Sequence, residues 1–208
     1  AFLIETIFDT LNAKVAIDAA IAIMAEYKRE LPIMISATIS DLAGRTLSGQ
    51  TLEGFLGSLS SYPIFSVGLN CSFGARQMKP FLASLAHKAP YYISVYPNAG
   101  LPNSLGQYDE SADSMAQQIE EYLDEGLVNI VGGCCGTTDE FIAKFAQLAK
   151  GRKPHRINAK SDAMWLSGLE LLELTPDIRF VNVGERCNVA GSRKFLRLIE
   201  NKQYDEAL

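Results

Sequence analysis

The segment Leu127-Val128-Asn129-Ile130-Val131-Gly132-Gly133-Cys134-Cys135-Gly136 sets an apolar run directly before two adjacent cysteines that lie between glycines. A short apolar run bounded by turn residues is typical of a buried β-strand. A similar run at residues 65–69 is followed by Cys71. If the two strands are neighbours in one sheet, three thiols converge at one end of it. Three thiolates without a fourth protein ligand predict a zinc ion with an open coordination position, as a catalytic zinc requires.

Strands and helices alternate along the chain on both sides of this segment. Apolar runs predict five strands, at residues 2–6, 32–37, 65–69, 91–95 and 127–131. A helix follows each strand; the first can be capped by Asp9 or Thr10, and Thr137 and Glu140 fit a capping box for the last. Alternating βα units imply an α/β fold with a parallel sheet, either open and doubly wound or closed as a (β/α)8 TIM barrel.

The polar motifs favour the barrel. No G-x-G-x-x-G or G-x-x-x-x-G-K-[ST] motif follows a strand, so nucleotide-binding folds lose support. Glu5, Cys71, Asn98 and the Cys134-Cys135 pair fall at the C-terminal ends of strands, where the active sites of such barrels lie. Two strand-to-helix connections, residues 38–50 and 97–110, are long, which is typical of functional loops.

The barrel is expected to be incomplete, because only five of its eight strands are predicted. Residues 1–150 would be the C-terminal part of the barrel. Residues 151–179 are basic and irregular and predict a linker with local structure. A strand at residues 180–184 and a helix at 192–200 predict the first βα unit of a second domain, at residues 180–208.

Composition excludes several classes of protein. The 208 residues are 48% apolar, enough for one large core, and the net charge of −5 argues against nucleic acid as the main partner. No apolar stretch is long enough for a membrane span. Four cysteines, two of them adjacent, do not form a disulfide scaffold, so we expect a reducing, cytoplasmic compartment.

The three cysteines would suit the alkylation of a thiol. Zinc lowers the pKa of a bound substrate thiol, so that it is deprotonated near neutral pH. The alternatives are that the cysteines are buried apolar residues, or that the zinc is structural. Neither His87, in a helix, nor His155, in the linker, is placed to close the site, and Cys187 is expected to be a non-ligand.

Two further residues have both a structural and a functional interpretation. Glu5 either caps a loop or faces the mouth of the barrel, where it would receive a substrate ammonium group. Asn98 is either a turn residue or an amide whose oxygen occupies the open zinc position until substrate displaces it.

These motifs resemble those of the homocysteine S-methyltransferase family over roughly residues 1 to 150. The segments that carry the resemblance are residues 4–6 (IET), 44–49 (GRTLSG), 68–71 (GLNC), 97–100 (PNAG) and 132–138 (GGCCGTT). It implies that Cys71, Cys134 and Cys135 bind zinc and that the sulfur of homocysteine takes the fourth place. Glu5 matches a residue that contacts the amino acid part of homocysteine, and Asn98 matches one near the zinc before substrate binds.

Residues 180–192 resemble the start of the pterin-binding barrel of cobalamin-dependent methionine synthases. Glu185 and Asn188 match pterin-pocket positions, while Cys187 stands where that family often has Thr. The order of the two modules implies a methyltransferase that uses methylcobalamin, recharged by methyltetrahydrofolate. Homocysteine and the cobalamin- and pterin-binding domains of the same polypeptide would be its partners. The truncated barrel is expected to be inactive alone.

Two other functions compete with this one. A cobalamin-independent homocysteine methyltransferase would lack the second module. A non-catalytic zinc- or thiol-binding module would be supported by a closed site of four cysteines that includes Cys187.

Overall fold

The computed structural model describes residues 1–182, 184 and 188–207, and the chain divides into two compact units. Unit 1 comprises Ala1–Leu174 and unit 2 comprises Thr175–Leu208. Glu5, Asn98 and the three cysteines of the predicted site all belong to unit 1.

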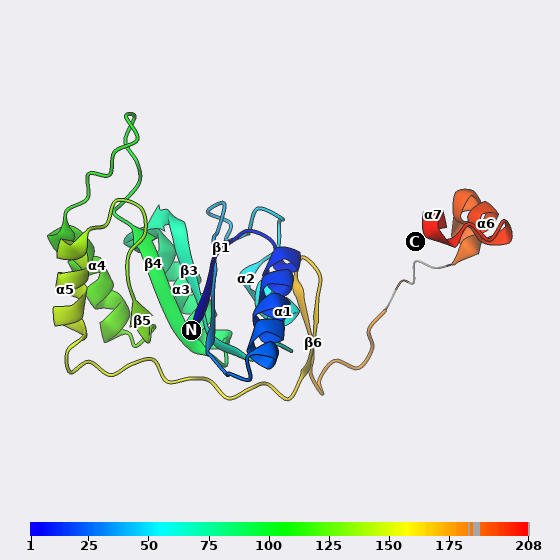
Figure 1. Cartoon of the computed structure of the whole chain (residues 1–208), viewed down its shortest axis with the longest axis horizontal. Coiled ribbons are helices and arrows are strands. Elements are labelled where there is room, and N and C mark those ends of the chain that lie inside the picture. Colours follow the sequence, from blue (N-terminus) through cyan, green and yellow to red (C-terminus); the bar gives the residue numbers. More distant parts are fainter. Residues whose placement is uncertain (183, 185–187, 208) are drawn as a thin grey trace. The chain divides into compact units, whose positions relative to one another are not determined.

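Unit 1 is built on a sheet of five parallel strands whose spatial order follows the chain, β1-β2-β3-β4-β5 (Figure 1). A doubly wound sheet reverses its strand order at a switch point, and this sheet does not. The architecture is therefore an α/β fold consistent with part of a TIM barrel. The strands are β1 (Phe2–Ile7), β2 (Ile33–Ala37), β3 (Ile64–Gly74), β4 (Tyr92–Asn98) and β5 (Ile130–Val131).

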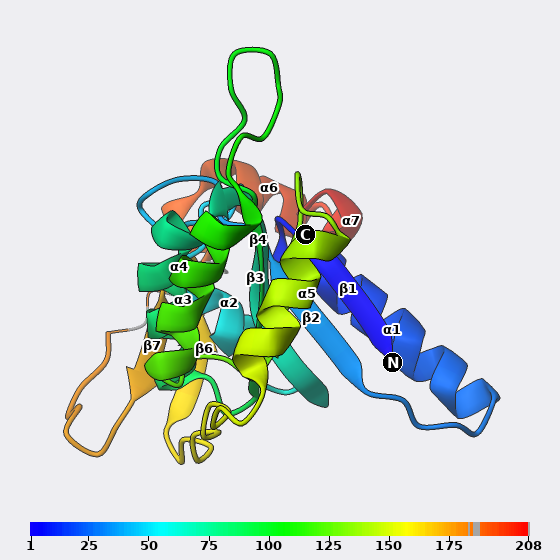
Figure 2. The ribbon, with the colours of Figure 1, turned by 90° about the vertical axis from the view of Figure 1, so that its left-hand side faces the viewer.

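A helix follows each strand, as the sequence predicts (Figure 2). The side chains of Asp9, Thr51 and Ser111 accept backbone N–H groups at the start of α1, α2 and α4. Among the described helices, none combines the length and the apolar character that crossing a membrane requires. The helices of the sheet are α1 (Thr10–Glu26), α2 (Leu52–Leu59), α3 (Ala75–Lys88), α4 (Ala112–Asp124) and α5 (Asp139–Ala149).

The capping box predicted for α5 is wrong. The residue before the helix is Thr138, whose side chain makes no capping hydrogen bond. The hydroxyl of Thr137 donates instead to the carbonyl oxygen of Cys134, at 2.7 Å. The hydroxyl of Thr137 is therefore bonded within the cysteine loop and does not cap α5.

The two faces of the sheet differ in chemistry. Ile35, Val67 and Ile93 are partners in register and are fully buried in the core. On the opposite face, Ser36, Gly68 and Ser94 are partners one residue further along. Towards the amino ends of the strands, Leu3, Phe65 and Tyr92 have exposed apolar side chains, and the ring centroids of Phe65 and Tyr92 are 4.8 Å apart.

Two strands differ most in length from the prediction, β3 and β5. β3 continues to Gly74 instead of ending at residue 69, so that Cys71 lies inside its last part. β5 has only two residues, although 127–131 was expected. The side chain of Asn129 explains the short strand, because its Oδ1 accepts the N–H of Ile93 at 2.8 Å and its Nδ2 donates to the carbonyl of His155 at 2.8 Å. These bonds replace part of the regular ladder.

An antiparallel hairpin closes unit 1, formed by β6 (Met164–Ser167) and β7 (Leu171–Leu174). It packs on α2, where the N–H of Thr51 donates to the carbonyl of Leu169 at 2.9 Å. A Cβ on Gly57 would lie 2.5 Å from Leu171 Cδ1, so a larger residue here would force the Leu171 side chain to move. The hairpin is local structure within the predicted linker of residues 151–179, and it packs as part of unit 1.

Unit 2 contains a 3-10 helix, Val189–Gly191, followed by α6 (Arg193–Glu200) and α7 (Tyr204–Ala207). The predicted helix at residues 192–200 is confirmed as α6, which Ser192 caps. Residues 180–182 and 184 are not in a strand, and residue 183 lies outside the described residues. A lone strand has no ladder to join, and the described part of unit 2 offers no second strand.

Candidate metal centre

A bulge in β3 directs Cys71 towards the next strand. The register of β3 with β4 shifts between the pairs Asn70↔Tyr96 and Gly74↔Asn98, so that β3 holds two more residues than its partner in this interval. Cys71 and Ser72 have positive φ angles of 64° and 61°. Left-handed backbone at two consecutive non-glycine residues costs free energy and is concentrated at functional sites.

A tight loop after β5 carries Cys134 and Cys135. The N–H of Cys134 donates to the carbonyl of Pro97 at 2.8 Å, and the carbonyl of Cys135 accepts the N–H of Ala99 at 2.9 Å. Gly136 has a φ of +79°, a conformation that favours glycine. The loop is therefore held against the end of β4 by backbone hydrogen bonds.

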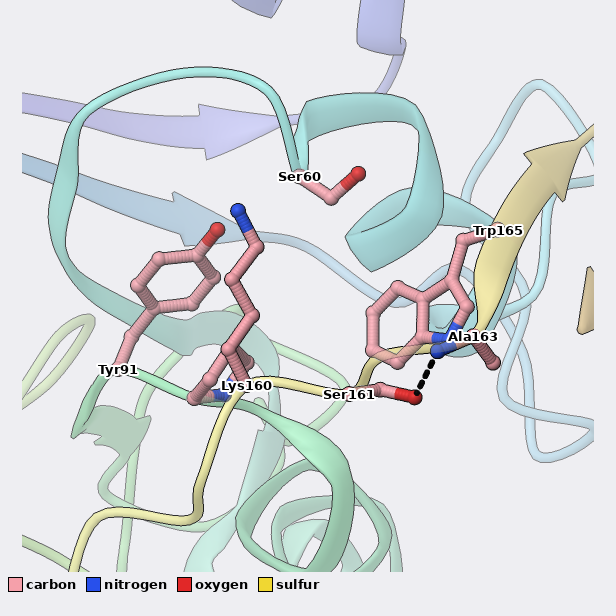
Figure 3. Close-up of a pocket in the computed structure, with 7 residues that line it drawn as sticks. Ser60, Tyr91, Lys160, Ser161, Ala163 and Trp165 are labelled. Carbon is pink, nitrogen blue, oxygen red and sulfur yellow. Dashed lines mark hydrogen bonds between the residues drawn. The ribbon is translucent and has the colours of Figure 1, made fainter.

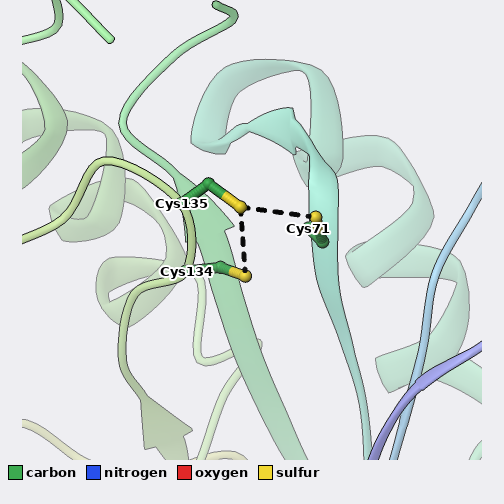
Figure 4. A group of neighbouring side chains, drawn as sticks. All are labelled: Cys71, Cys134 and Cys135. Carbon is green, nitrogen blue, oxygen red and sulfur yellow. Dashed lines mark hydrogen bonds between the residues drawn. The ribbon is translucent and has the colours of Figure 1, made fainter. Parts of the chain in front are cut away.

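The structure brings the three cysteines together, as the sequence predicts (Figure 4). The sulfurs of Cys71 and Cys135 are 3.7 Å apart, those of Cys134 and Cys135 are 3.9 Å apart, and all three lie within 4.8 Å of one another. Zn–S bonds of about 2.3 Å at tetrahedral angles place sulfurs about 3.8 Å apart. The spacing fits three corners of a zinc tetrahedron.

The neighbouring thiols influence each other's protonation. Burial first, and then the thiols of Cys71 and Cys135, raise the pKa of Cys134 to about 11. For Cys135 burial also acts to raise the pKa, but hydrogen bonds from Cys71, Tyr108 and Cys134 outweigh it and lower the pKa. Three close thiolates repel one another, so a bound cation would be needed to hold all of them deprotonated.

Asn98 supports the cysteine loop. Its side chain is 2% exposed, and its Oδ1 accepts the N–H of Cys135 at 3.1 Å. Asn98 is the last residue of β4, and its amide oxygen accepts a backbone donor of the cysteine loop.

Glu5 lies on β1 with an exposed side chain. Ile4 pairs with Ile35, and the register of β1 with β2 shifts between Ile4 and Ile7, so Glu5 lies in an irregular part of the strand. Burial raises the pKa of the half-buried Tyr96 on β4, and the charge of Glu5 raises it further. Glu5 is therefore close enough to Tyr96 for its charge to act on that phenol.

Two residues near the candidate metal centre were not predicted from the sequence. Asn70 is buried, and its Oδ1 accepts from Ser36 Oγ at 2.7 Å and from the N–H of Thr6 at 3.1 Å. It therefore ties β1 and β2 to β3 immediately before Cys71. Its position directly before Cys71 in the sequence could have identified it. Tyr108, in the long connection after β4, packs against Gly136 of the cysteine loop, and only the length of that connection pointed to it.

The predicted pterin residues lie in unit 2. Asn188 is exposed, and its side chain accepts the N–H of Ala190 at 2.9 Å. Glu185 and Cys187 lie outside the described residues. His155 is not near the cysteines; its Nδ1 lies 2.8 Å from the carbonyl oxygen of Gly126.

A separate small pocket lies between the chain leading into β6 and the amino end of β4 (Figure 3). It contains no thiol and no carboxylate, and this distinguishes it from the candidate metal centre. Its lining residues are Ser60, Pro90, Tyr91, Lys160, Ser161, Ala163 and Trp165.

Comparison with known proteins agrees with this architecture. The model of the family described as "Homocysteine S-methyltransferase" matches residues 1–149. The solved structure of the homocysteine methyltransferase MmuM from Escherichia coli in its apo form has a TM-score of 0.50 and 22% sequence identity, covering 71% of this chain and 48% of that one. The metallated form of MmuM has a TM-score of 0.44 and 24% identity, covering 63% and 40%.

The present chain therefore spans about half the length of the E. coli protein. The likeness to MmuM shows a shared fold, whereas the family model covers most of the chain, including all three cysteines, Glu5 and Asn98. The chain belongs to the homocysteine S-methyltransferase family.

Proposed function

We propose that this chain is part of a zinc-dependent methyltransferase that methylates the thiolate of homocysteine to give methionine. One observation carries the proposal. In a chain of this family, three sulfurs at the carboxyl end of the sheet are spaced as the corners of a zinc tetrahedron. Among the described residues, no fourth Cys, His, Asp or Glu joins the group, which leaves a place for the substrate sulfur.

Cys71, Cys134 and Cys135 would hold the metal. When bound, zinc would act as a Lewis acid that lowers the pKa of the substrate thiol. In the transfer itself, the sulfur forms a bond to the methyl carbon while the bond from that carbon to its donor breaks. The donor keeps the electron pair, and the proton of the thiol has already been lost to solvent.

Glu5 is proposed to bind the ammonium group of homocysteine. Its side chain is exposed, and its charge acts on Tyr96, which pairs with Asn70 immediately before Cys71. Asn98 is proposed to border the substrate sulfur. In this structure its amide oxygen holds Cys135, which supports a role in orienting a metal ligand.

The methyl donor is proposed to be methylcobalamin, recharged by 5-methyltetrahydrofolate, with both bound on domains of the same cytoplasmic polypeptide. The support is the likeness of residues 180–192 to the start of a pterin-binding barrel. In this proposal residues 1–150 belong to the homocysteine barrel, 151–179 link it to the second domain, and 180–208 begin that domain, with Glu185 and Asn188 in the pterin pocket.

The barrel is proposed to be incomplete in this chain. Its five strands run in the sequential order of a TIM barrel, which has eight, and the chain covers about half of MmuM. Parallel strand edges without partners expose backbone hydrogen-bonding groups. We therefore expect no methionine formation by the chain alone, and measurable formation from homocysteine and methylcobalamin would contradict this.

The decisive experiment is zinc per chain by elemental analysis, with circular dichroism as the test of folding. The wild-type chain is expected to bind about one zinc, and Cys134→Ser little, because a catalytic site has three protein ligands. Cys187→Ser is the matched control and should keep the metal. A folded wild-type chain without zinc would contradict the metal centre.

The same variants distinguish the competing functions. Loss of zinc in Cys187→Ser would favour a closed site of four cysteines and a non-catalytic module. With cobalt(II) in place of zinc, homocysteine should change the absorption spectrum if it binds the metal. No change would count against a substrate site.

A further inference from the structure

Three residues with left-handed backbone adjoin one buried residue, Asn70. Cys71 and Ser72 follow it in β3, with φ angles of 64° and 61°, and Thr6, near the end of β1, has a φ of 59°. Threonine is branched at Cβ, so this conformation is strained and persists only where surrounding contacts impose it. At Thr6, the contacts that impose it come from Asn70.

The side chain of Asn70 holds Thr6 at two points. Its Oδ1 accepts the N–H of Thr6 at 3.1 Å, and its Nδ2 donates to Thr6 Oγ1 at 3.0 Å. The register of β1 with β2 shifts between Ile4 and Ile7, so the regular ladder is interrupted at this place. The amide of Asn70 therefore fixes the part of β1 that the ladder leaves free, and Glu5 is in that part.

Asn70 is itself anchored in the sheet. It is 1% exposed, its Oδ1 also accepts from Ser36 Oγ at 2.7 Å, and its carbonyl oxygen accepts from Thr38 Oγ1 at 3.1 Å. A buried amide with several partners has one orientation, because any other would leave polar groups unsatisfied. One side chain thus connects the end of β1 to β3 across the intervening strand β2.

We propose that Asn70 is a positioning residue that holds Glu5 at a fixed place relative to the metal centre, so that the site selects thiols that carry an ammonium group. Glu5 directly precedes Thr6, and Cys71 directly follows Asn70, so the contact between Asn70 and Thr6 joins the two parts of the site. The inference rests on the proposed function, which assigns the substrate thiol to the metal and its ammonium group to Glu5. A charged group favours one ligand over another only when it is held in the right geometry.

The test compares two thiols on the cobalt(II)-loaded chain. Homocysteine and 4-sulfanylbutanoate share the thiol, the chain length and the carboxylate, but 4-sulfanylbutanoate has no ammonium group. The change in the absorption spectrum gives an apparent Kd for each thiol. Wild type is expected to bind homocysteine about tenfold more tightly, as is common for a hydrogen bond to a charged group.

Thr6→Val is the variant that tests the contact. A methyl group cannot approach Asn70 Nδ2 to the 3.0 Å of the present hydrogen bond, so the segment must move. The variant should lose most of the preference for homocysteine and bind 4-sulfanylbutanoate as wild type does. Thr6→Ser keeps the hydroxyl and should keep the preference. Thr10→Val is the matched control, at the start of α1 where Asp9 supplies the cap, and should also keep it.

Both thiols are titrated on every variant, so their different acidities cancel from the comparison. Only metal-bound molecules contribute to the spectrum, so a less stable variant still gives a valid ratio. Circular dichroism confirms that each variant is folded. A loss of preference in Thr6→Val that Thr6→Ser restores would support the role of Asn70.

The outcomes separate this inference from the proposed function. A folded wild-type chain that binds no metal, or whose cobalt spectrum neither thiol changes, contradicts the proposed substrate site and this inference with it. A preference that Glu5→Gln abolishes and Thr6→Val retains refutes the role of Asn70 alone. Equal weakening of both thiols in Thr6→Val also refutes it, because the contact would then support the fold without selecting the ammonium group.

Discussion

Cys71 and Cys135 are 64 positions apart in the chain, yet their sulfurs lie 3.7 Å from each other. The contact joins the end of β3 to the loop after β5, across the intervening strand β4. It depends on the bulge at Cys71, because a regular β3 would continue along β4 without turning its thiol towards Cys135.

Replacement of Cys71 by Ser should remove most of the bound zinc, because two thiolates and a neutral hydroxyl bind the ion more weakly than three thiolates. Elemental analysis of the purified variant checks this. The far-ultraviolet circular dichroism should stay that of wild type, since the thiol is only partly buried. Full zinc content in Cys71→Ser would show that this cysteine is not a ligand.

Replacement of Gly68 by Ala should destabilise the fold by about 1–3 kcal/mol, the usual cost of overpacking a core. A Cβ at this position would lie 2.1 Å from both the carbonyl oxygen and the Oγ of Ser94. Urea denaturation measures the loss. Gly168→Ala is the control, because nothing lies within 4 Å of its Cβ position. Equal stability of the two variants would contradict the close packing of β3 on β4.

Replacement of Asn70 by Ala should cost about 1–3 kcal/mol, because it leaves the buried Ser36 hydroxyl without its acceptor. It also removes the bonds between Asn70 and Thr6 that tie β1 to β3. Chemical denaturation and zinc content are the measurements, and both should fall. The exposed Asn12 on α1 provides the control, and Asn12→Ala should leave both values unchanged.

The packing of the β6–β7 hairpin should depend on pH through Glu173. Hydrogen bonds from Lys88 first, and then from Trp165, lower the pKa of its carboxyl in the folded chain. Because the unfolded carboxyl keeps the ordinary pKa of about 4.3, the stabilisation is present above that pH and is lost as the pH falls below it.

Unfolding experiments between neutral pH and acid pH test this. Glu173→Gln should be less stable than wild type at pH 7, and the difference should shrink as the pH falls below the ordinary carboxyl range. Glu26→Gln, at the exposed end of α1, is the control and should follow wild type. A constant difference between Glu173→Gln and wild type at all pH values would contradict the ionic contribution.

Much of the fold could be predicted because it depends on local patterns. Apolar runs alternating with helical periodicity indicated the five βα units, and each predicted helix of unit 1 is present. The ends of the strands and helices were less predictable. β3 extends through the bulge at Cys71, β5 is shortened by the side chain of Asn129, and the hydroxyl of Thr137 bonds to Cys134 instead of capping α5. In each case a contact with a distant or functional segment outweighs the local preference.

The sequence by itself determined which thiols can meet. Cysteines that follow parallel strands lie at the same edge of the sheet, whatever the details of packing. Only the tertiary structure decided how they meet, because the direction of the Cys71 thiol depends on two left-handed residues where the register of β3 with β4 shifts. It also decided that Tyr108 packs on the cysteine loop at Gly136, since that contact requires a long loop to fold back, and spacing along a chain carries no information about such a return.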